Sequence, residues 1–378
     1  MYGSDLEEGF SLDGMMRYSH FVPRLYNYCL SLGFKSGQII PSRAFCSDEN
    51  QGFPIILLAK HFGSFPFNHG RVGGVVATDR HGPHAHHGQD MVIIHASHVG
   101  YDPEKGVFGQ YCRLQTTDHK KTTTCGKIGG VIQPYLEDYR FAQKHILLGR
   151  MDDVKTITID NQLLNDTRVE GLFPDLVRMI SQNQGSPDLL RKLSSSKVFV
   201  LSEELASTMP SDTFQEGRLV EISKYLTADF FCFKKSFSGQ IEDHDHVENN
   251  LFEAMPDIVT SSSPLLRAAQ VNTQVEFDRA FRSMAQEKEY RHKKLLFISC
   301  LNIDISPKEG QLFPLTKCIP WAASMQDELG NSKVFEQEEI ISELQKQSHE
   351  NPHQIDLEKA IQCMIKAPEV KIDLHNIQ

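Results

Sequence analysis

The sequence predicts an α/β fold in which a largely parallel, mixed sheet is flanked by helices. Short apolar runs of strand length alternate along the chain with segments that carry apolar residues at helical spacing, and this alternation is typical of a parallel sheet. The run MVIIHAS at residues 91–97 is almost continuously apolar, as expected of a strand covered on both faces. With 378 residues and a hydrophobic content of 40%, the chain can fill a substantial core.

Three elements begin this pattern. The run IIPSRAFC predicts a strand over residues 43–46 that ends at Cys46, and the compact apolar segment GFPIILLAKHFG predicts a helix after it. Residues 91–98 form the next strand and lead into the turn signal HVGYDPEKG. A helix begins at Cys125, where apolar residues recur at helical spacing, although two glycines and a proline weaken its first turns.

The later segments continue the alternation of strands and helices. VKTITID near residue 155 and KVFVLS near residue 197 predict strands, with a helix over roughly 163–182 between them. KKLLFISCLNIDI predicts one more buried strand, and EEIISELQK predicts an exposed helix. We expect these strands to join a parallel sheet.

A change of composition divides the chain. Residues 241–264 turn acidic, in IEDHDHVENN, and then serine-rich, in TSSSP, which favours a linker or a long excursion. We therefore separate a first domain, residues 1–240, from a C-terminal region, residues 241–378. This region forms either a separate domain or additional layers on the same core.

The charge and the termini exclude several classes of function. The formal net charge of −10, from 49 acidic and 39 basic residues, gives no broad basic field for nucleic acid or an anionic membrane. The N-terminal segment is acidic where a secretory signal needs basic and apolar residues, and no stretch of eighteen apolar residues occurs. We expect a soluble, cytoplasmic protein whose eight dispersed cysteines are reduced thiols, some of them available to a metal.

Cys46, His98 and Cys125 are candidate ligands of one metal ion. Ligands in open α/β sheets collect beyond the carboxyl ends of the strands, where we expect the first two residues to lie. A thiol at a helix N-terminus, as predicted for Cys125, is favoured as a thiolate. Two thiolates and one imidazole are a known catalytic zinc set with an open fourth position. The separations of 52 and 27 residues are far from the close pairs of zinc fingers, and taken alone they favour buried, structural side chains.

Histidines concentrate around this site and leave alternatives open. Six of the 17 histidines fall within eighteen residues, at positions 81, 84, 86, 87, 95 and 98. HAHHGQD invites comparison with binuclear zinc hydrolases, but Gly88 and Gln89 stand where those enzymes need an acid and a third histidine. His95 competes with His98 as a ligand, and because the two would point to opposite faces of a strand, only one can face the metal.

Five short motifs, in order, resemble the LCIB/LCIC family. These low-carbon-dioxide-inducible proteins of algae and their bacterial relatives look like β-type carbonic anhydrases and are also called theta-type. The matching pieces cover roughly residues 40–145 and are CSD at 46–48, GSFPF at 63–67, HAHHGQD at 84–90, SHVG at 97–100 and TCG at 124–126.

The resemblance implies a β-carbonic-anhydrase-like sheet and a Zn2+ ion held by Cys46, His98 and Cys125. It implies a zinc lyase, a carbonic anhydrase that interconverts carbon dioxide and bicarbonate by zinc-hydroxide attack, in a homodimer. Asp48 would orient the hydroxide, and His86 or His87 would carry protons outward, because imidazole titrates near neutrality.

One departure from the family pattern bears on activity. The family motif is Cys-x-Asp-x-Arg, and this chain has Asn50 at the arginine position. An amide offers a neutral hydrogen bond in place of a charged fork, so Asp48 could move onto zinc and close the site unless Arg43, Arg71 or Arg80 restrains it. One alternative follows from this departure: a catalytically degenerate zinc-binding homologue with a structural or partner-binding role. A second alternative is a zinc hydrolase acting on another small electrophile, because a zinc hydroxide is not committed to one substrate.

Overall fold

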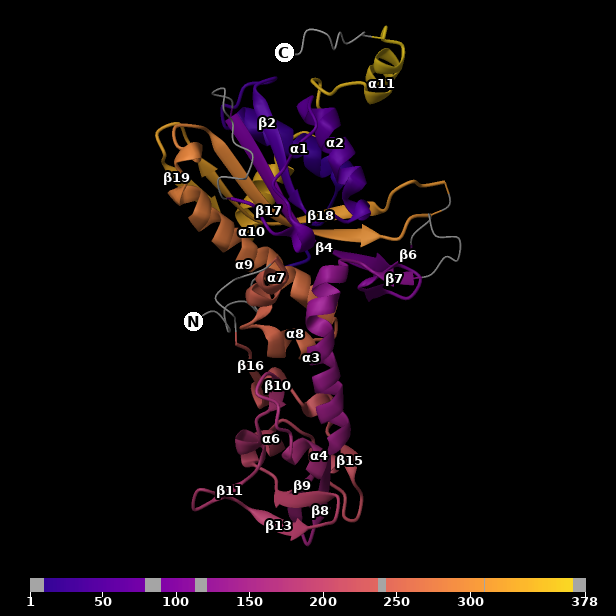
Figure 1. Ribbon diagram of the computed structural model, residues 1–378, viewed down its shortest axis with the longest axis vertical. Helices are drawn as coiled ribbons and strands as arrows, with labels where there is room; N and C mark the ends of the chain where they lie inside the picture. Colours follow the sequence, from indigo (N-terminus) through magenta and orange to yellow (C-terminus); the bar gives the residue numbers. More distant parts are fainter. Residues whose placement is uncertain (1–9, 79–89, 113–120, 237–242, 309, 370–378) are drawn as a thin grey trace, which may run out of the picture.

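The computed structural model describes residues 10–78, 90–112, 121–236, 243–308 and 310–369. The molecule is elongated. A wide body holds the largest sheet, and a narrower distal lobe extends from it along the helix α3 (Gly126–His145), as Figure 1 shows. None of the helices within the described ranges is long and apolar enough to cross a membrane.

The sheet of the body is mixed. Its strand order is β1-β18-β17-β4-β2-β3. In addition, β19 pairs with β18 and β5 pairs with β4. The central pairs β17–β4, β4–β2 and β2–β3 are parallel, whereas β18 pairs with β1, β17 and β19 in antiparallel fashion. The strands are β1 (Met16–Arg17), β2 (Ile39–Phe45), β3 (Phe67–Asn68), β4 (Asp90–Asp102), β5 (Val107–Phe108), β17 (Leu295–Ile305), β18 (Leu315–Gln326) and β19 (Ser332–Phe335).

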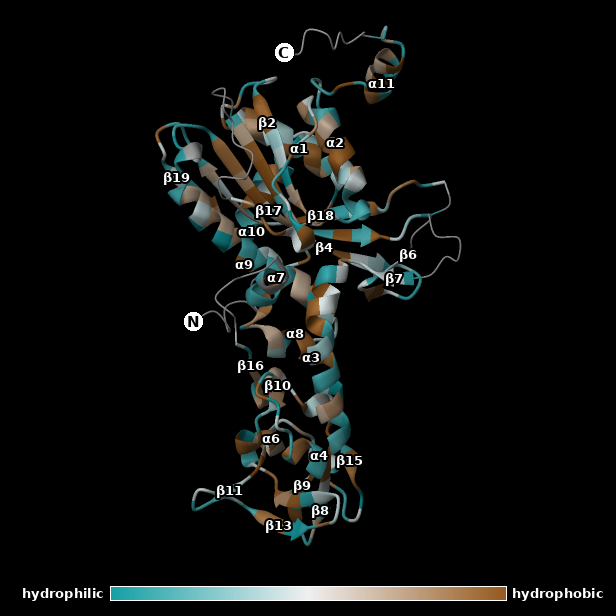
Figure 2. Ribbon diagram, in the orientation of Figure 1, coloured by the Kyte–Doolittle hydropathy of each residue, from teal (hydrophilic) through white to brown (hydrophobic). Residues whose placement is uncertain are grey.

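Helices cover both faces of this sheet, which confirms the predicted mixed sheet flanked by helices. Because side chains alternate along β4, Val92 and Ile94 face a core built with α1 (Tyr18–Ser31), α2 (Gly52–Phe62) and α10 (Gln337–Gln345). Met91 and Ile93 face the other core, which contains residues of α9 (Pro264–Gln286). Figure 2 shows the hydrophobic residues gathered on the central strands. The predicted helix EEIISELQK corresponds to α10, but it buries Ile340 and Leu344 and is therefore not simply exposed.

A third core connects the sheet to the distal lobe along α3. It contains residues of α7 (Asp243–Leu251) and α8 (Met255–Thr260), among them Val247, Leu251 and Ile258. These helices occupy most of the segment for which the sequence predicts a linker or a long excursion, and because they pack into this core, a linker is wrong. The apolar residues of the segment are few but are spaced to bury one side of each short helix, and its polar residues give the composition of a linker.

The distal lobe contains an antiparallel sheet in the order β13-β14-β9-β8-β15. Strands are present near 155 and 197 as predicted, but they pair directly and antiparallel, so their expected place in a parallel sheet is wrong. The strands are β8 (Ile146–Met151), β9 (Val154–Asp160), β13 (Leu189–Lys192), β14 (Ser196–Val200) and β15 (Val220–Glu221).

The predicted helix over 163–182 is also wrong. Short elements replace it, because Gly171 adopts a φ of 134° and Pro174 interrupts helical hydrogen bonding. They are α4 (Asn161–Leu164), β10 (Gly171–Pro174) and α5 (Leu176–Met179). The remaining elements are β6 (Gln110–Cys112), β7 (Lys121–Thr123), β11 (Gln182–Asn183), β12 (Ser186–Pro187), α6 (Glu203–Ser207), β16 (Phe231–Lys234) and α11 (Leu357–Ile365).

Candidate metal centre

Cys46, His98 and Cys125 lie close together in the interior of the protein. Their ligand atoms are all within 4.8 Å of one another, and all three side chains are buried. Around a tetrahedral zinc ion two sulfur ligands lie about 3.8 Å apart, so this spacing is close to what a shared ion requires. The group could therefore bind a metal ion.

Each of the three residues is positioned by a different element. Cys46 directly follows β2, and Cys125 is the N-cap of α3, as the sequence predicts. Cys125 adopts a φ of 50°, a conformation that non-glycine residues rarely take and that is often found at functional sites. His98 does not end its strand, contrary to prediction. β4 continues to Asp102 because its parallel pairing with β17 extends through Tyr101.

The surroundings of His98 fit a metal ligand. Its Nδ1 lies 2.8 Å from Oδ2 of Asp304, a buried carboxylate on β17. Its Nε2 is buried and has no hydrogen-bond partner within the described part of the chain. A histidine that binds a metal through one ring nitrogen usually donates the other N–H to a carboxylate, which fixes the tautomer. The unpartnered Nε2 is therefore the atom that would bind the ion.

Asp304 is itself held by a buried hydrogen-bond network. Thr316 donates to its Oδ1 at 2.9 Å, and the amide of Gln51 donates to its Oδ2 at 3.0 Å. Asn302 donates to Gln51 Oε1 at 2.8 Å, and the Tyr18 hydroxyl donates to Asn302 Oδ1 at 2.9 Å. We call Asp304, Gln51, Asn302, Thr316 and Tyr18 the Asp304 network.

The ionisation of the three side chains also favours a cation. A hydrogen bond from the Cys125 thiol lowers the pKa of Cys46 to about 3, although burial opposes this shift. The same bond raises the pKa of Cys125. Burial alone would lower the pKa of His98, but the charge of Cys125 and the Asp304 carboxylate raise it well above its ordinary value. A bound cation would replace these protons.

His95 faces away from the metal centre, as predicted from strand alternation. It is fully buried, and its Nδ1 lies 2.7 Å from the Ser299 hydroxyl. Burial lowers the pKa of His95 to about 4, so this histidine is neutral at physiological pH. It is therefore a packed, hydrogen-bonded residue, and the alternative of His95 as a ligand fails.

The predicted catalytic residues are only partly described. Asp48 is the N-cap of a 3-10 turn, Glu49–Gln51, and its Oδ1 accepts a hydrogen bond from the Asn50 N–H at 3.4 Å. Asn50 is 1% exposed, and neither atom of its amide group has a hydrogen-bond partner among the described residues. His86 and His87, like Arg80, lie outside the described residues.

Sequence reasoning did not find Asp304. Its signal is present in LNIDI, where Asn302 and Asp304 stand two residues apart in an otherwise apolar strand and therefore share one face. A buried polar pair on one face of a strand is a candidate support for a functional side chain. The sequence does not indicate which histidine the pair would support, because 206 residues separate Asp304 from His98.

No family model matches this chain. No curated protein matches it either. Its structural neighbours include the crystal structure of PtLCIB4, a homolog of the limiting CO2-inducible protein LCIB, with 12% identity and a TM-score of 0.49 over 86% of this chain and 95% of that one. The crystal structure of LCIB itself is similar with 10% identity and a TM-score of 0.45, over 89% of this chain and 99% of that one. Likeness at this level transfers no residue role, activity or assembly to this chain.

Proposed function

We propose that Cys46, His98 and Cys125 bind zinc and that the protein is a carbonic anhydrase, which interconverts carbon dioxide and bicarbonate. The convergence of two buried sulfurs and one imidazole nitrogen, with the imidazole held by Asp304, is the observation that supports this proposal. Three protein ligands with a free fourth position are typical of catalytic zinc. When bound, zinc would make hydroxide available near neutral pH for attack on carbon dioxide.

The protein's own side chains would have separate roles. Asp304 accepts the Nδ1 proton of His98 and so keeps Nε2 directed at the metal position. Asp48, two residues after Cys46, would orient the nucleophile as a hydrogen-bond acceptor, and His86 or His87 would carry the proton to solvent.

Metal analysis and stopped-flow hydration of carbon dioxide test this proposal together. We expect the wild-type protein to contain one zinc ion per chain and to accelerate hydration, and Cys125→Ala to lose both properties. Cys363→Ala is a matched control, because Cys363 is exposed on α11 and should change neither. A wild-type protein with full zinc occupancy that hydrates carbon dioxide no faster than the uncatalysed rate would refute the proposed carbonic anhydrase activity.

The environment of Asn50 favours a second candidate, a degenerate homologue whose zinc is structural. Asn50 replaces the arginine that the family motif expects beside the metal, and it is buried without a hydrogen-bond partner for its amide among the described residues. In this case zinc would stabilise the fold without turnover. Removing zinc would then lower the melting temperature, while assays with carbon dioxide and with small esters would both stay at the uncatalysed rate. Ester hydrolysis without carbon dioxide hydration would instead identify a hydrolase.

A further inference from the structure

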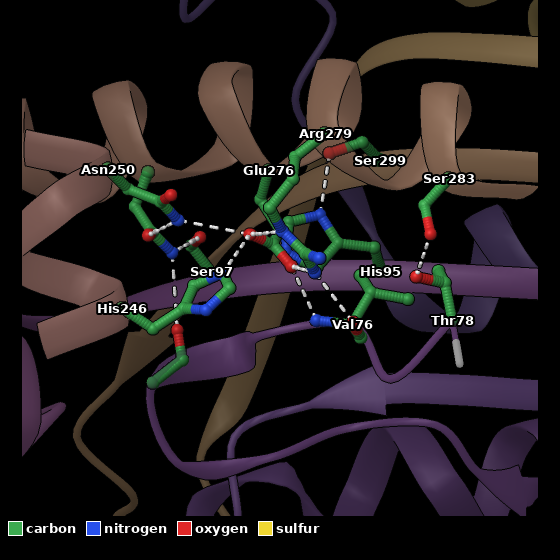
Figure 3. Close-up of polar contacts among 12 residues, drawn as sticks. Val76, Thr78, His95, Ser97, His246, Asn250, Glu276, Arg279, Ser283 and Ser299 are labelled. Atoms are coloured by element: carbon green, nitrogen blue, oxygen red, sulfur yellow. Dashed lines mark hydrogen bonds and ion pairs between the residues drawn. The ribbon is translucent and has the colours of Figure 1, made fainter. Parts of the chain in front are cut away.

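A second buried carboxylate, Glu276, lies on the face of the sheet opposite Asp304. Its side chain is 0% exposed, and Figure 3 shows it among donors from three segments of the chain. Its Oε1 accepts from the Val76 N–H at 2.5 Å, and its Oε2 accepts from Asn250 and from Nε of Arg279, each at 3.0 Å. Burial raises the pKa of Glu276, but His246 and Arg279 lower it, with a net value of about 2. Glu276 is therefore a carboxylate at physiological pH.

The groups around Glu276 hold the loop at residues 71–76. Arg279 donates to the Val76 carbonyl at 2.6 Å, while Glu276 accepts from the N–H of the same residue. Asn250 also donates to Asn272 at 2.9 Å, and Asn272 donates to the Gly73 carbonyl at 3.2 Å. The loop is thus fixed both at its middle and at its end. We call Glu276, Arg279, Asn250 and Asn272 the Glu276 network.

The loop follows a path that requires glycine. Gly73 and Gly74 have φ values of 82° and 78°, in the left-handed region that favours glycine. A Cβ atom on Gly74 would lie 2.8 Å from the Ala96 carbonyl oxygen, so the loop rests directly on the backbone of β4. Asn272, on α9, also links this part of the loop to β4, because its side-chain amide donates to the Ser97 hydroxyl at 2.8 Å.

This path brings a backbone donor to the metal centre. The Gly73 N–H donates to Sγ of Cys46 at 3.3 Å, while the carbonyl of the same residue is held by Asn272. A hydrogen bond to a thiolate stabilises its charge and tunes the metal that it binds. The backbone of Gly73 therefore connects the Glu276 network to one of the three proposed ligands.

We propose that Glu276 is a positioning residue for the metal centre: it fixes the Gly73 loop so that the loop's N–H donates to the Cys46 sulfur. This inference rests on the proposed function only in requiring that the centre binds a metal. Without the network the loop would move off Cys46, and the sulfur, no longer bonded to the Gly73 N–H, would donate more charge to a bound metal. The centre would still bind the metal less tightly, because Cys46 would no longer be held in place beside His98 and Cys125. Loss of outer-shell support typically costs at least tenfold in affinity.

Cobalt substitution of the full-length protein tests this inference. In Glu276→Gln and Asn272→Ala we expect zinc affinity to fall about tenfold and the sulfur-to-cobalt charge-transfer band to move to lower energy. Asn351→Ala is the matched control, because Asn351 is also a buried asparagine but bonds His61 and not the loop. It should lower stability without moving the band.

Arg279→Lys keeps the inference testable if the stronger variants do not fold. The Arg279 side chain is 31% exposed. Lysine keeps the positive charge, but it lacks the planar guanidinium that bonds Glu276 and the Val76 carbonyl together. We expect a smaller shift of the band in the same direction. Folded variants with the wild-type band and affinity would overturn the inference. A wild-type protein that binds cobalt normally but does not hydrate carbon dioxide would overturn the proposed function alone.

Discussion

The Asp304 network and the Glu276 network lie on opposite faces of the same sheet, and both are built around a buried carboxylate, but they support the proposed ligands in different ways. Each has a fully buried carboxylate surrounded by donors. Asp304 contacts a proposed ligand directly, at 2.8 Å from His98, whereas Glu276 reaches Cys46 only through the backbone of a loop. A metal ligand can thus be supported by orienting its side chain or by fixing a backbone donor beside it. The first route should have the larger effect.

Two histidines of β4 show the same contrast. His98 and His95 are three residues apart and face opposite sides of the sheet, and their pKa values shift in opposite directions. Anionic neighbours outweigh burial at His98 and raise its pKa. At His95 burial dominates over the charge of Glu276 and lowers the pKa to about 4. Position on a strand therefore decides in which direction the pKa of a buried imidazole shifts.

Asp304→Asn should give the largest effect. An amide cannot accept the His98 proton with a full negative charge and can instead donate to Nδ1, which would favour the wrong tautomer. We expect zinc affinity to fall by about 10- to 100-fold, equivalent to about 1.4–2.7 kcal/mol. Competition with a chromophoric chelator measures this loss. An affinity equal to that of the wild type would show that Asp304 supports the fold and not the ligand.

The sequence predicts the region around the metal centre better than the rest of the molecule. β4 and β17 each contain a largely apolar stretch of strand length, the end of β2 precedes Cys46, and the start of α3 is marked by Cys125, so local patterns suffice for them. For the distal lobe the sequence predicts a helix and parallel strands, because nothing in its short segments indicates that β9 and β14 pair directly and antiparallel. The supporting carboxylates could not be assigned, because 200 residues separate Glu276 from Val76 and no local pattern connects them.

The pH dependence of stability provides a second way to distinguish the two faces of the sheet. Burial keeps the pKa of His95 at about 4 in the folded protein, whereas in the unfolded chain it has the ordinary histidine pKa of about 6.5. As pH falls from 7 to 5 the unfolded state takes up a proton that the folded state does not, so the contribution of His95 to the free energy of unfolding decreases by about 2 kcal/mol. Urea unfolding of the metal-free protein should show a smaller decrease for His95→Gln than for the wild type.

His61 requires a control in that experiment. Burial also lowers the pKa of His61 to about 4, so it contributes to the same pH window. His61→Gln should reduce the acid sensitivity independently, because His61 lies in α2 beside Asn351 and away from Glu276. Equal acid sensitivity of His95→Gln and the wild type would contradict a neutral, buried His95.

Tyr18→Phe tests the outer end of the Asp304 network. Removing the hydroxyl leaves Asn302 Oδ1 without its donor at 2.9 Å, and an unpaired buried acceptor costs about 1 kcal/mol of stability or more. Because two further residues separate Tyr18 from Asp304, zinc affinity should change less than about threefold. Calorimetry and chelator competition on one preparation measure the two effects. A loss of affinity as large as that of Asp304→Asn would show that the network acts as one rigid unit.

The smallest effect expected is the coupling between the two faces. Asp304→Asn acts on His98, whereas Asn272→Ala acts on the loop beside Cys46. Within the described part of the chain, no hydrogen bond joins the two substituted residues. Their costs in zinc-binding free energy should therefore add to within about 0.5 kcal/mol in the double variant. A coupling of more than about 1 kcal/mol would mean that the two faces respond to each other through the metal centre. In that case the Asp304 and Glu276 networks would not support the ligands independently. They would differ only in how far each carboxylate lies from the ligand that it supports.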